Sequence, residues 1–271
     1  MPLAIVDTHA HLDMKDFDND RGEVIARAEQ AGVFRILTVG TGMPASEEAV
    51  AIADKHPSVY AAVGIHPHDA LGVSKTDIDR LKELSKHPKV LALGEMGLDF
   101  YRMYSPRDAQ GQVLQWQLEL AIELRLPVII HARQSAREMM HVLSEWMKQR
   151  GDISGKAPGV IHCFGNNIQS LIDELKIAQH YLGLGFYLAF GGYVSYAGSK
   201  APELLKALPA DRLLLETDCP FLPPQQYRKQ RRNEPAYVTV TLQVMAEARG
   251  VTIEEMARQT TENANKLFKF Q

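Results

Sequence analysis

Short apolar runs recur along the chain at intervals of about thirty residues, the length of one strand followed by one helix. Each run is apolar almost throughout, as expected for strands of a parallel sheet that is buried on both faces. The runs are LAIVDTH, VFRILTVG, VYAAVGIHP, VLALGEMG, PVIIHAR, GVIHCF, YLGLGF and RLLLETDCP. They predict eight parallel strands, of which the seventh covers residues 181–186.

The segments between these runs have the composition and spacing of amphipathic helices. They include residues 21–32, 45–56, 76–87, 107–125, 135–150 and 167–180, and several end at Gly or at His followed by Pro. The connection before the eighth run is less regular and holds a short helix near residues 201–208. This alternation predicts an α/β protein with a closed TIM-type (β/α)8 barrel, and an open doubly wound sheet is the alternative.

The chain has 271 residues, so we expect one domain over residues 1–271, because such a barrel needs about 250. Hydrophobic residues make up 45% and charged residues 23%, which predicts a sizeable core. A formal net charge of -3 argues against coating nucleic acid through bulk positive charge, but it permits a local basic patch.

Location and redox state follow from what the sequence lacks. The N-terminal segment has no basic region of an export signal, and no apolar run approaches the length of about 20 residues that spans a membrane. Cys163 and Cys219 are far apart and follow no zinc-ribbon spacing. We therefore expect a cytoplasmic protein without a disulfide or a membrane partner.

Ionisable residues stand at most of the predicted strand ends. In a barrel of this type the loops after the strands surround one mouth, where the chemistry takes place. The residues at these ends are His9, His11, His66, Glu95, His131, His162 and Asp218. His9 and His11 can both face the mouth, because residues i and i+2 of a strand point to the same side. A single histidine there is more often structural, but burying so many ionisable groups together without a metal would be costly.

Imidazole and carboxylate ligands without cysteine suit zinc, manganese, nickel or iron, and they leave magnesium possible. Four histidines with Glu95 and Asp218 are too many for one catalytic zinc, which keeps three protein ligands and an open position. They suit two divalent ions with a bridging carboxylate. The remaining histidines are interpreted as structural, with His68 on the surface of a loop, and the two cysteines as packing residues.

Six motifs follow one another in order: DTHAHL, GIHPH, GEMGLDFY, IIHAR, IHCF and LLLETDCPFL. Over essentially the whole chain they resemble the TatD-type metal-dependent deoxyribonucleases of the amidohydrolase superfamily. The resemblance implies that His9, His11 and Asp218 hold one ion, that His131 and His162 hold the other, and that Glu95 bridges them. Many amidohydrolases carry a carboxylated lysine at the bridge, so Glu95 separates this chain from dihydroorotase-like relatives.

The family's activity is hydrolysis of DNA phosphodiesters, commonly as a 3′-to-5′ exonuclease on single strands. The resemblance therefore implies attack by a metal-activated water, with Glu95 and Asp218 as catalytic residues and Asp218 accepting the proton. His66 is expected to contact a phosphate oxygen or the leaving group, and Arg133 to bind a phosphate in the mouth. No obligate protein partner is implied.

Two loops bear on the substrate. The segment DFYRMY places Tyr101, Arg102 and Tyr104 beside the mouth, where they can stack on a base and hold its phosphate, although ordinary loop packing is the alternative. The segment QQYRKQRRNEPAYV is the densest basic run, with Arg228, Lys229, Arg231 and Arg232. It either contacts substrate phosphates or forms a solvated face. This loop lacks the glycine that the family often has before NEP, and HCFGNN lacks the family's frequent Ser-Gly after HCF.

Two other functions fit the same residues. Two ions would also polarise a carbonyl group, so a D-aminoacyl-tRNA deacylase or another carbonyl-bond hydrolase is the first alternative, with tRNA in place of DNA. A non-catalytic nucleic-acid-binding barrel is the second, and the intact set of candidate ligands argues against it.

Overall fold

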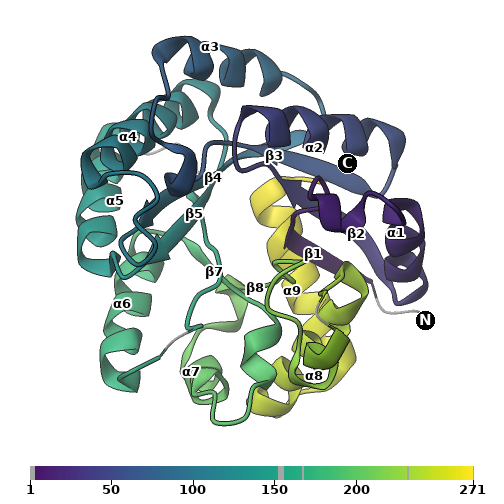
Figure 1. Cartoon of the computed structure of the whole chain (residues 1–271). Helices are drawn as coiled ribbons and strands as arrows, with labels where there is room; N and C mark the ends of the chain where they lie inside the picture. Colours follow the sequence, from purple (N-terminus) through teal and green to yellow (C-terminus); the bar gives the residue numbers. More distant parts are fainter. Residues whose placement is uncertain (1–3, 152–155, 167, 231, 271) are drawn as a thin grey trace.

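The computed structural model describes residues 4–151, 156–166, 168–230 and 232–270. Parallel strands follow one another around a barrel in chain order (Figure 1). They are β1 Ile5–Ala10, β2 Val33–Val39, β3 Val59–Val63, β4 Val90–Asp99, β5 Val128–Arg133, β6 Gly159–Ile161, β7 Tyr187–Phe190 and β8 Leu213–Leu215. The barrel closes just beyond β8, where Ala10 forms a parallel bridge with Cys219. The predicted TIM-type (β/α)8 barrel is confirmed.

Helices α1 to α8 cover the outside of the barrel and follow its strands in turn, and α9 follows α8 (Figure 1). They are α1 Arg21–Gln30, α2 Met43–Lys55, α3 Lys75–Leu84, α4 Arg107–Leu124, α5 Ala136–Arg150, α6 Leu171–Gly183, α7 Ala201–Ala207, α8 Val238–Arg249 and α9 Ile253–Phe268. Short 3-10 helices occupy Lys15–Phe17, Pro67–Asp69, Gly192–Ser195, Ala210–Arg212, Gln225–Gln230 and Pro235–Tyr237.

The predicted position of the seventh strand, residues 181–186, is wrong. Residues 181–183 continue α6, and β7 is formed by the next apolar run, Tyr187–Phe190. Tyr181 is buried as part of the core-facing side of the helix. Gly185 follows the helix cap with a φ of 89°, a left-handed conformation that ends helices and favours glycine. The helix predicted from residue 167, which lies outside the described residues, begins at Leu171 because the Ser170 hydroxyl caps it.

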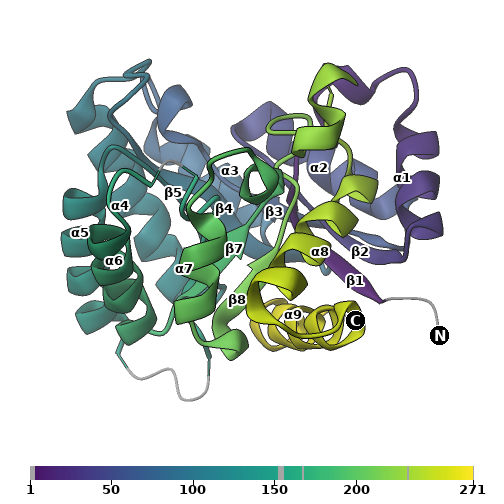
Figure 2. The same ribbon diagram turned by 90° about the horizontal axis from the view of Figure 1, so that it is seen from below.

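The described residues form two apolar clusters. The larger lies between the barrel and the surrounding helices. The smaller fills the inside of the barrel with side chains such as Val39, Ile129 and Leu214. Leu267 and Phe268 of α9 pack against this inner cluster, so α9 covers the end of the barrel where the strands begin (Figure 2). The inside of the barrel is therefore packed and covered at this end, and the opposite end, where the strands finish, is left for a functional site.

A capping box holds the start of α9. The Thr252 hydroxyl accepts a hydrogen bond from the Glu255 amide at 3.1 Å, and the Glu255 carboxylate accepts one from the Thr252 amide at 2.9 Å. We expect Thr252→Ala to lower the free energy of unfolding by about 1 kcal/mol, because one amide of the first turn loses its partner. Urea denaturation measures this loss. Thr76→Ala, an exposed threonine inside α3, is the control, and equal stability of both variants would contradict the capping role.

Candidate metal centre

The six predicted ligands meet at the open end of the barrel, opposite α9. His9, Glu95 and His131 belong to β1, β4 and β5. His11 and His162 directly follow β1 and β6, and Asp218 is the third residue after β8. Except for the half-buried His131, all of them are buried. Residues from five strands of the barrel thus place their polar atoms in one small volume.

His9 and His11 face each other, as the i and i+2 spacing predicts. Their Nε2 atoms lie 3.2 Å apart. His11 Nδ1 donates to the carbonyl of Val39 at 2.8 Å, so in the neutral ring Nε2 keeps its lone pair for the site. His9 Nδ1 is buried with no hydrogen-bond partner among the described residues, which leaves Nε2 as the nitrogen that makes this ring's contacts.

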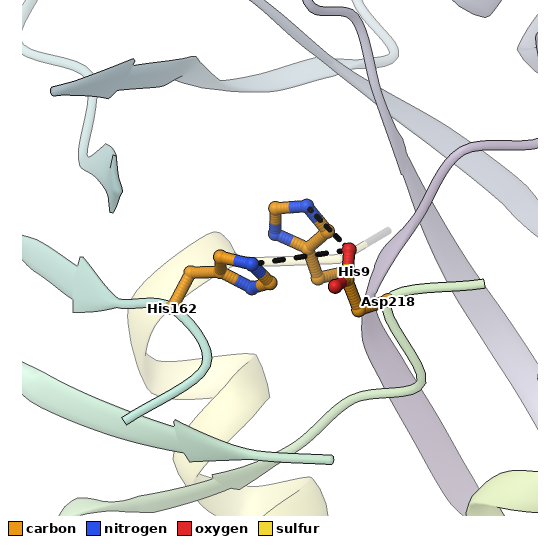
Figure 3. A group of neighbouring side chains, drawn as sticks. All are labelled: His9, His162 and Asp218. Carbon is orange, nitrogen blue, oxygen red and sulfur yellow. Dashed lines mark ion pairs between the residues drawn. The ribbon is translucent and has the colours of Figure 1, made fainter. Parts of the chain in front are cut away.

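Asp218 and His162 complete this side of the centre. Asp218 Oδ1 lies 3.4 Å from His11 Nε2 and 3.9 Å from His9 Nε2. It also lies 3.9 Å from His162 Nε2, so His9 and His162 share this carboxylate (Figure 3). The rings of His9 and His162 stack with their centroids 3.7 Å apart. The donor atoms of His9, His162 and Asp218 are close enough to hold one ion together.

Glu95 lies between the two halves of the site. Its Oε2 is 3.4 Å from His9 Nε2 and 3.7 Å from His11 Nε2. Its Oε1 is 2.9 Å from His131 Nδ1 and 3.9 Å from His162 Nε2. One carboxylate oxygen therefore faces the histidines of β1, and the other faces His131 and His162. A carboxylate whose two oxygens face separate groups of histidines is placed to contact two ions.

Glu216, which the sequence reasoning missed, orients His162. Its Oε2 accepts a hydrogen bond from His162 Nδ1 at 3.0 Å, and its Oε1 accepts one from the Cys163 amide at 2.7 Å. The bond fixes the proton on Nδ1 and turns Nε2 towards the centre, an arrangement common for metal-binding histidines. The signal was present in the sequence, since Glu216 stands two residues before Asp218 in ETD.

Asp99 orients His131 in the way that Glu216 orients His162. Its Oδ2 lies 3.2 Å from His131 Nε2, while His131 Nδ1 faces Glu95. The same oxygen lies 2.9 Å from His68 Nε2. The interpretation of His68 as a surface residue is therefore wrong, because the turn at Pro67–Asp69 brings its ring back against Asp99. Asp99 follows Glu95 by four residues and faces the same side of β4, a spacing that could have indicated it.

Asp7 connects β1 to the segment after β8. It accepts hydrogen bonds from the Thr217 amide at 2.9 Å, from the Thr217 hydroxyl at 2.6 Å and from the His9 amide at 3.3 Å. The next amide, that of Asp218, donates to the His9 carbonyl at 2.9 Å. These bonds fix the backbones that carry His9 and Asp218 relative to each other.

His66 faces the centre through Nε2, the ring nitrogen that carries the proton. Its Nδ1 accepts a hydrogen bond from the His68 amide at 3.1 Å, so in the neutral ring the proton is on Nε2. That nitrogen lies 3.6 Å from Glu95 Oε1. Burial lowers the pKa of His66 to about 3, which keeps the ring neutral. The geometry therefore suits a hydrogen-bond donor better than a metal ligand.

The buried carboxylates make the site negatively charged, so positive charge is stabilised there. Burial disfavours protonation of His162, but Glu216, Asp218 and Glu95 outweigh it and raise the pKa of His162 to about 10. Burial likewise opposes ionisation of Glu95, yet His162, His131 and His9 hold the pKa of its carboxyl well below the usual range. Divalent ions supply positive charge in place of those protons, because a histidine ligand must be neutral. The donors present therefore fit a metal centre.

The predicted substrate residues gather beside the centre. The Arg133 guanidinium lies 4.1 Å from the centroid of the Tyr101 ring, and that of Arg102 lies 5.5 Å from it. Asp99 Oδ1 accepts hydrogen bonds from the amides of Tyr101 and Arg102 at 2.9 and 2.8 Å. Arg133, Tyr101 and Arg102 are all exposed, so an exposed aromatic ring and two guanidinium groups stand together at the mouth.

The basic loop after β8 divides into two parts. Arg232 donates to both carboxylate oxygens of Asp20 at 2.7 Å, and these bonds lower the pKa of Asp20 to about 2. Arg232 therefore fastens the loop to the start of α1 and is not available for a phosphate. Arg228 lies 4.7 Å from the ring of Tyr196 and Lys229 is exposed, so both can meet substrate. Arg231 lies outside the described residues.

Comparison with known proteins settles the family. The family model described as TatD related DNase matches residues 6–269. The chain belongs to the TatD family. It is a metal-dependent hydrolase of that family, and the resemblance of its six motifs is confirmed. Within the described residues, none of the helices combines the length and the apolar character needed to cross a membrane.

Relatives support the same conclusion. The chain is 41% identical over 266 residues to the uncharacterized metal-dependent hydrolase YabD of Bacillus subtilis, covering 98% of this chain and 99% of that protein. It is 36% identical over 268 residues to the 3′-5′ ssDNA/RNA exonuclease TatD of Klebsiella pneumoniae, covering 97% of each. The crystal structure of the TatD homolog YJJV from Escherichia coli superposes with a TM-score of 0.89 at 30% identity and covers 100% of both chains.

Proposed function

We propose that this TatD-family enzyme hydrolyses the phosphodiester bonds of single-stranded DNA and releases nucleotides from the 3′ end. The main support for this proposal is the placement of Glu95 between two groups of histidines, because such a set of donors would hold two ions able to activate a phosphodiester. Relatives named as 3′-5′ ssDNA/RNA exonucleases support the substrate and the direction. The exposed Arg133 and Arg102 are suited to bind its phosphates.

His9, His11 and Asp218 would hold one ion, His131 and His162 the other, and Glu95 would bridge them. The donor atoms suit zinc, manganese, magnesium or nickel. When bound, the ions would polarise the phosphodiester, lower the pKa of the attacking water and stabilise the leaving oxygen.

The chain's own residues position the substrate and move the proton. Asp218 would accept the proton of the attacking water, and its backbone is held by the bond from its amide to the His9 carbonyl. His66 Nε2 would donate to a phosphate oxygen or to the leaving group, in the protonation state that its bond to the His68 amide fixes. Arg133 and Arg102 would hold the phosphate beside the Tyr101 ring.

Two substrates test the proposal directly. Metal-loaded protein is incubated with single-stranded DNA carrying an internal label, and in parallel with a D-aminoacyl-tRNA. Release of mononucleotides that stops in chelator, with shortening from the 3′ end, supports the proposed function. Intact DNA beside deacylated tRNA would replace the nuclease with a carbonyl-bond hydrolase using the same ions.

Glu216→Gln tests the orientation of His162. The amide keeps the size of the side chain but loses the negative charge that holds the His162 Nδ1 proton, so we expect metal affinity to fall by about 10- to 100-fold. Titration of metal-free protein with Zn²⁺ or Mn²⁺ measures the change. Glu203→Gln, on an exposed position of α7, is the matched control. Equal affinity in both variants would show that Glu216 does not support a ligand.

A further inference from the structure

Exposed large apolar side chains gather at the mouth of the barrel. Within the described ranges such side chains lie mainly on the loops that follow β3, β4 and β8, at Leu71, Tyr101, Met103, Tyr104 and Phe221. These loops leave the same end of the barrel as Glu95 and Asp218. Exposed apolar groups that concentrate beside a functional site indicate a surface that contacts another molecule.

Phe221 presents an exposed ring on a fixed backbone. Its side chain is 48% exposed, and its ring centroid lies 6.0 Å from that of His11. The Phe221 amide donates to the Asp218 carbonyl at 2.9 Å, and its carbonyl accepts from the side chain of Asn233 at 2.7 Å. Asn233 is fully buried and also donates to the Thr217 carbonyl at 2.8 Å. The ring is therefore held in place next to Asp218 without being covered.

Tyr101, on the loop after β4, likewise combines an exposed ring with a hydrogen-bonded backbone. Its ring is 52% exposed, while its amide is held by Asp99, the carboxylate that contacts His131. Arg133 lies against the ring. Because the Arg133 guanidinium lies over one face of this ring, a base would stack on the opposite face or displace the guanidinium, and the cation would meet the neighbouring phosphate.

The two rings stand on opposite sides of the mouth. Phe221 is anchored where β8 meets β1, through Asp218 and His11. Tyr101 is anchored where β4 meets β5, through Asp99 and Arg133. In a barrel of eight strands in chain order, these two junctions are half a turn apart. The candidate metal ligands come from strands on both sides of the mouth, so a strand bound at Glu95 would lie between the two rings.

We propose that Phe221 and Tyr101 stack on the bases on the two sides of the cleaved phosphate, and that this contact makes the enzyme select unpaired strands. The inference rests on the proposed function. In a duplex only the outer face of the terminal pair is uncovered, so the two rings cannot both reach bases on the two sides of the cleaved phosphate without opening the helix. A bare phosphodiester backbone, in contrast, gives the rings nothing to stack on.

Removal of the bases from the substrate tests this contact. Cleavage is followed on a single-stranded oligonucleotide and on the same oligonucleotide with abasic residues at its two 3′-terminal positions. We expect the wild type to lose about tenfold in kcat/KM on the abasic substrate for each stack that is lost. Phe221→Ala and Tyr101→Ala each reduce kcat/KM on the normal substrate by about the same factor and have a smaller effect on the abasic one.

Further variants separate stacking from folding. Phe221→Trp keeps a ring and restores the preference for bases, whereas Phe221→Leu keeps only apolar volume and does not. Val251→Ala, an exposed apolar residue after α8, is the control and leaves both rates unchanged. The double variant Phe221→Ala with Tyr101→Ala also lowers the ratio of single-strand to duplex cleavage.

Two results would overturn the inference in different ways. If Phe221→Ala slows cleavage of the normal and abasic substrates equally, or if Phe221→Leu behaves as Phe221→Trp, the ring supports the loop and does not stack on a base. If the wild type cleaves neither oligonucleotide in the presence of metal, the proposed nuclease function fails, and the stacking contact fails with it.

Discussion

Glu95→Gln is expected to reduce kcat on single-stranded DNA by about 1,000-fold or more and to lower the number of metal ions bound per chain relative to the wild type. The amide has nearly the same shape as the carboxylate, so the packing around it is retained. It carries no charge, however, and it replaces one oxygen with a nitrogen that has no lone pair for a metal. Because Oε1 and Oε2 face different histidines, the variant cannot serve both halves of the site.

Two measurements on the same protein check this prediction. Elemental analysis gives the number of ions per chain, and cleavage of 3′-labelled single-stranded DNA gives the rate. Glu203→Gln on α7 again serves as the control for the chemical change, and circular dichroism shows whether the barrel is folded. A folded Glu95→Gln protein that holds two ions and cleaves DNA at the wild-type rate would show that Glu95 is not the bridge.

Asp218→Asn is expected to reduce kcat by about 10²- to 10⁴-fold, the range associated with the loss of a general base. Asn cannot accept the proton of the attacking water, and it is a weaker ligand than a carboxylate. The KM for DNA is expected to change much less than kcat, because the exposed Arg133 and Tyr101 that would bind the strand are unaltered. Steady-state kinetics at saturating metal separates the two parameters.

The metal concentration distinguishes the two roles of Asp218. If Asp218 is both ligand and proton acceptor, excess metal refills the site without restoring the rate. If excess metal restores wild-type kcat, Asp218 acts as a ligand alone, and the assignment of the proton acceptor is wrong. Asp211→Asn, at an exposed position before β8, provides the matched control for the substitution.

The alternation of apolar runs and amphipathic segments was sufficient to predict the barrel, because each strand of a buried parallel sheet must be apolar on both faces. The seventh strand shows the limit of this reasoning. YLGLGF and YLAF are both short apolar runs, and only the packing of Tyr181 into the core and the turn at Gly185 assign the first to a helix. This error did not change the predicted ligands, since neither run contains one.

The sequence by itself also determined which side chains could meet in the candidate centre. His9 and His11 point to the same side because they are two residues apart on a strand. The ends of the parallel strands meet at one mouth of the barrel for any length or sequence of the loops. What only the tertiary structure decided is which partner each side chain takes. Glu216 orients His162 and Arg232 binds Asp20, because folding brings together residues that are far apart along the chain. For the same physical reason, the opposition of Phe221 and Tyr101 across the mouth exists only once the eight strands have closed into a barrel.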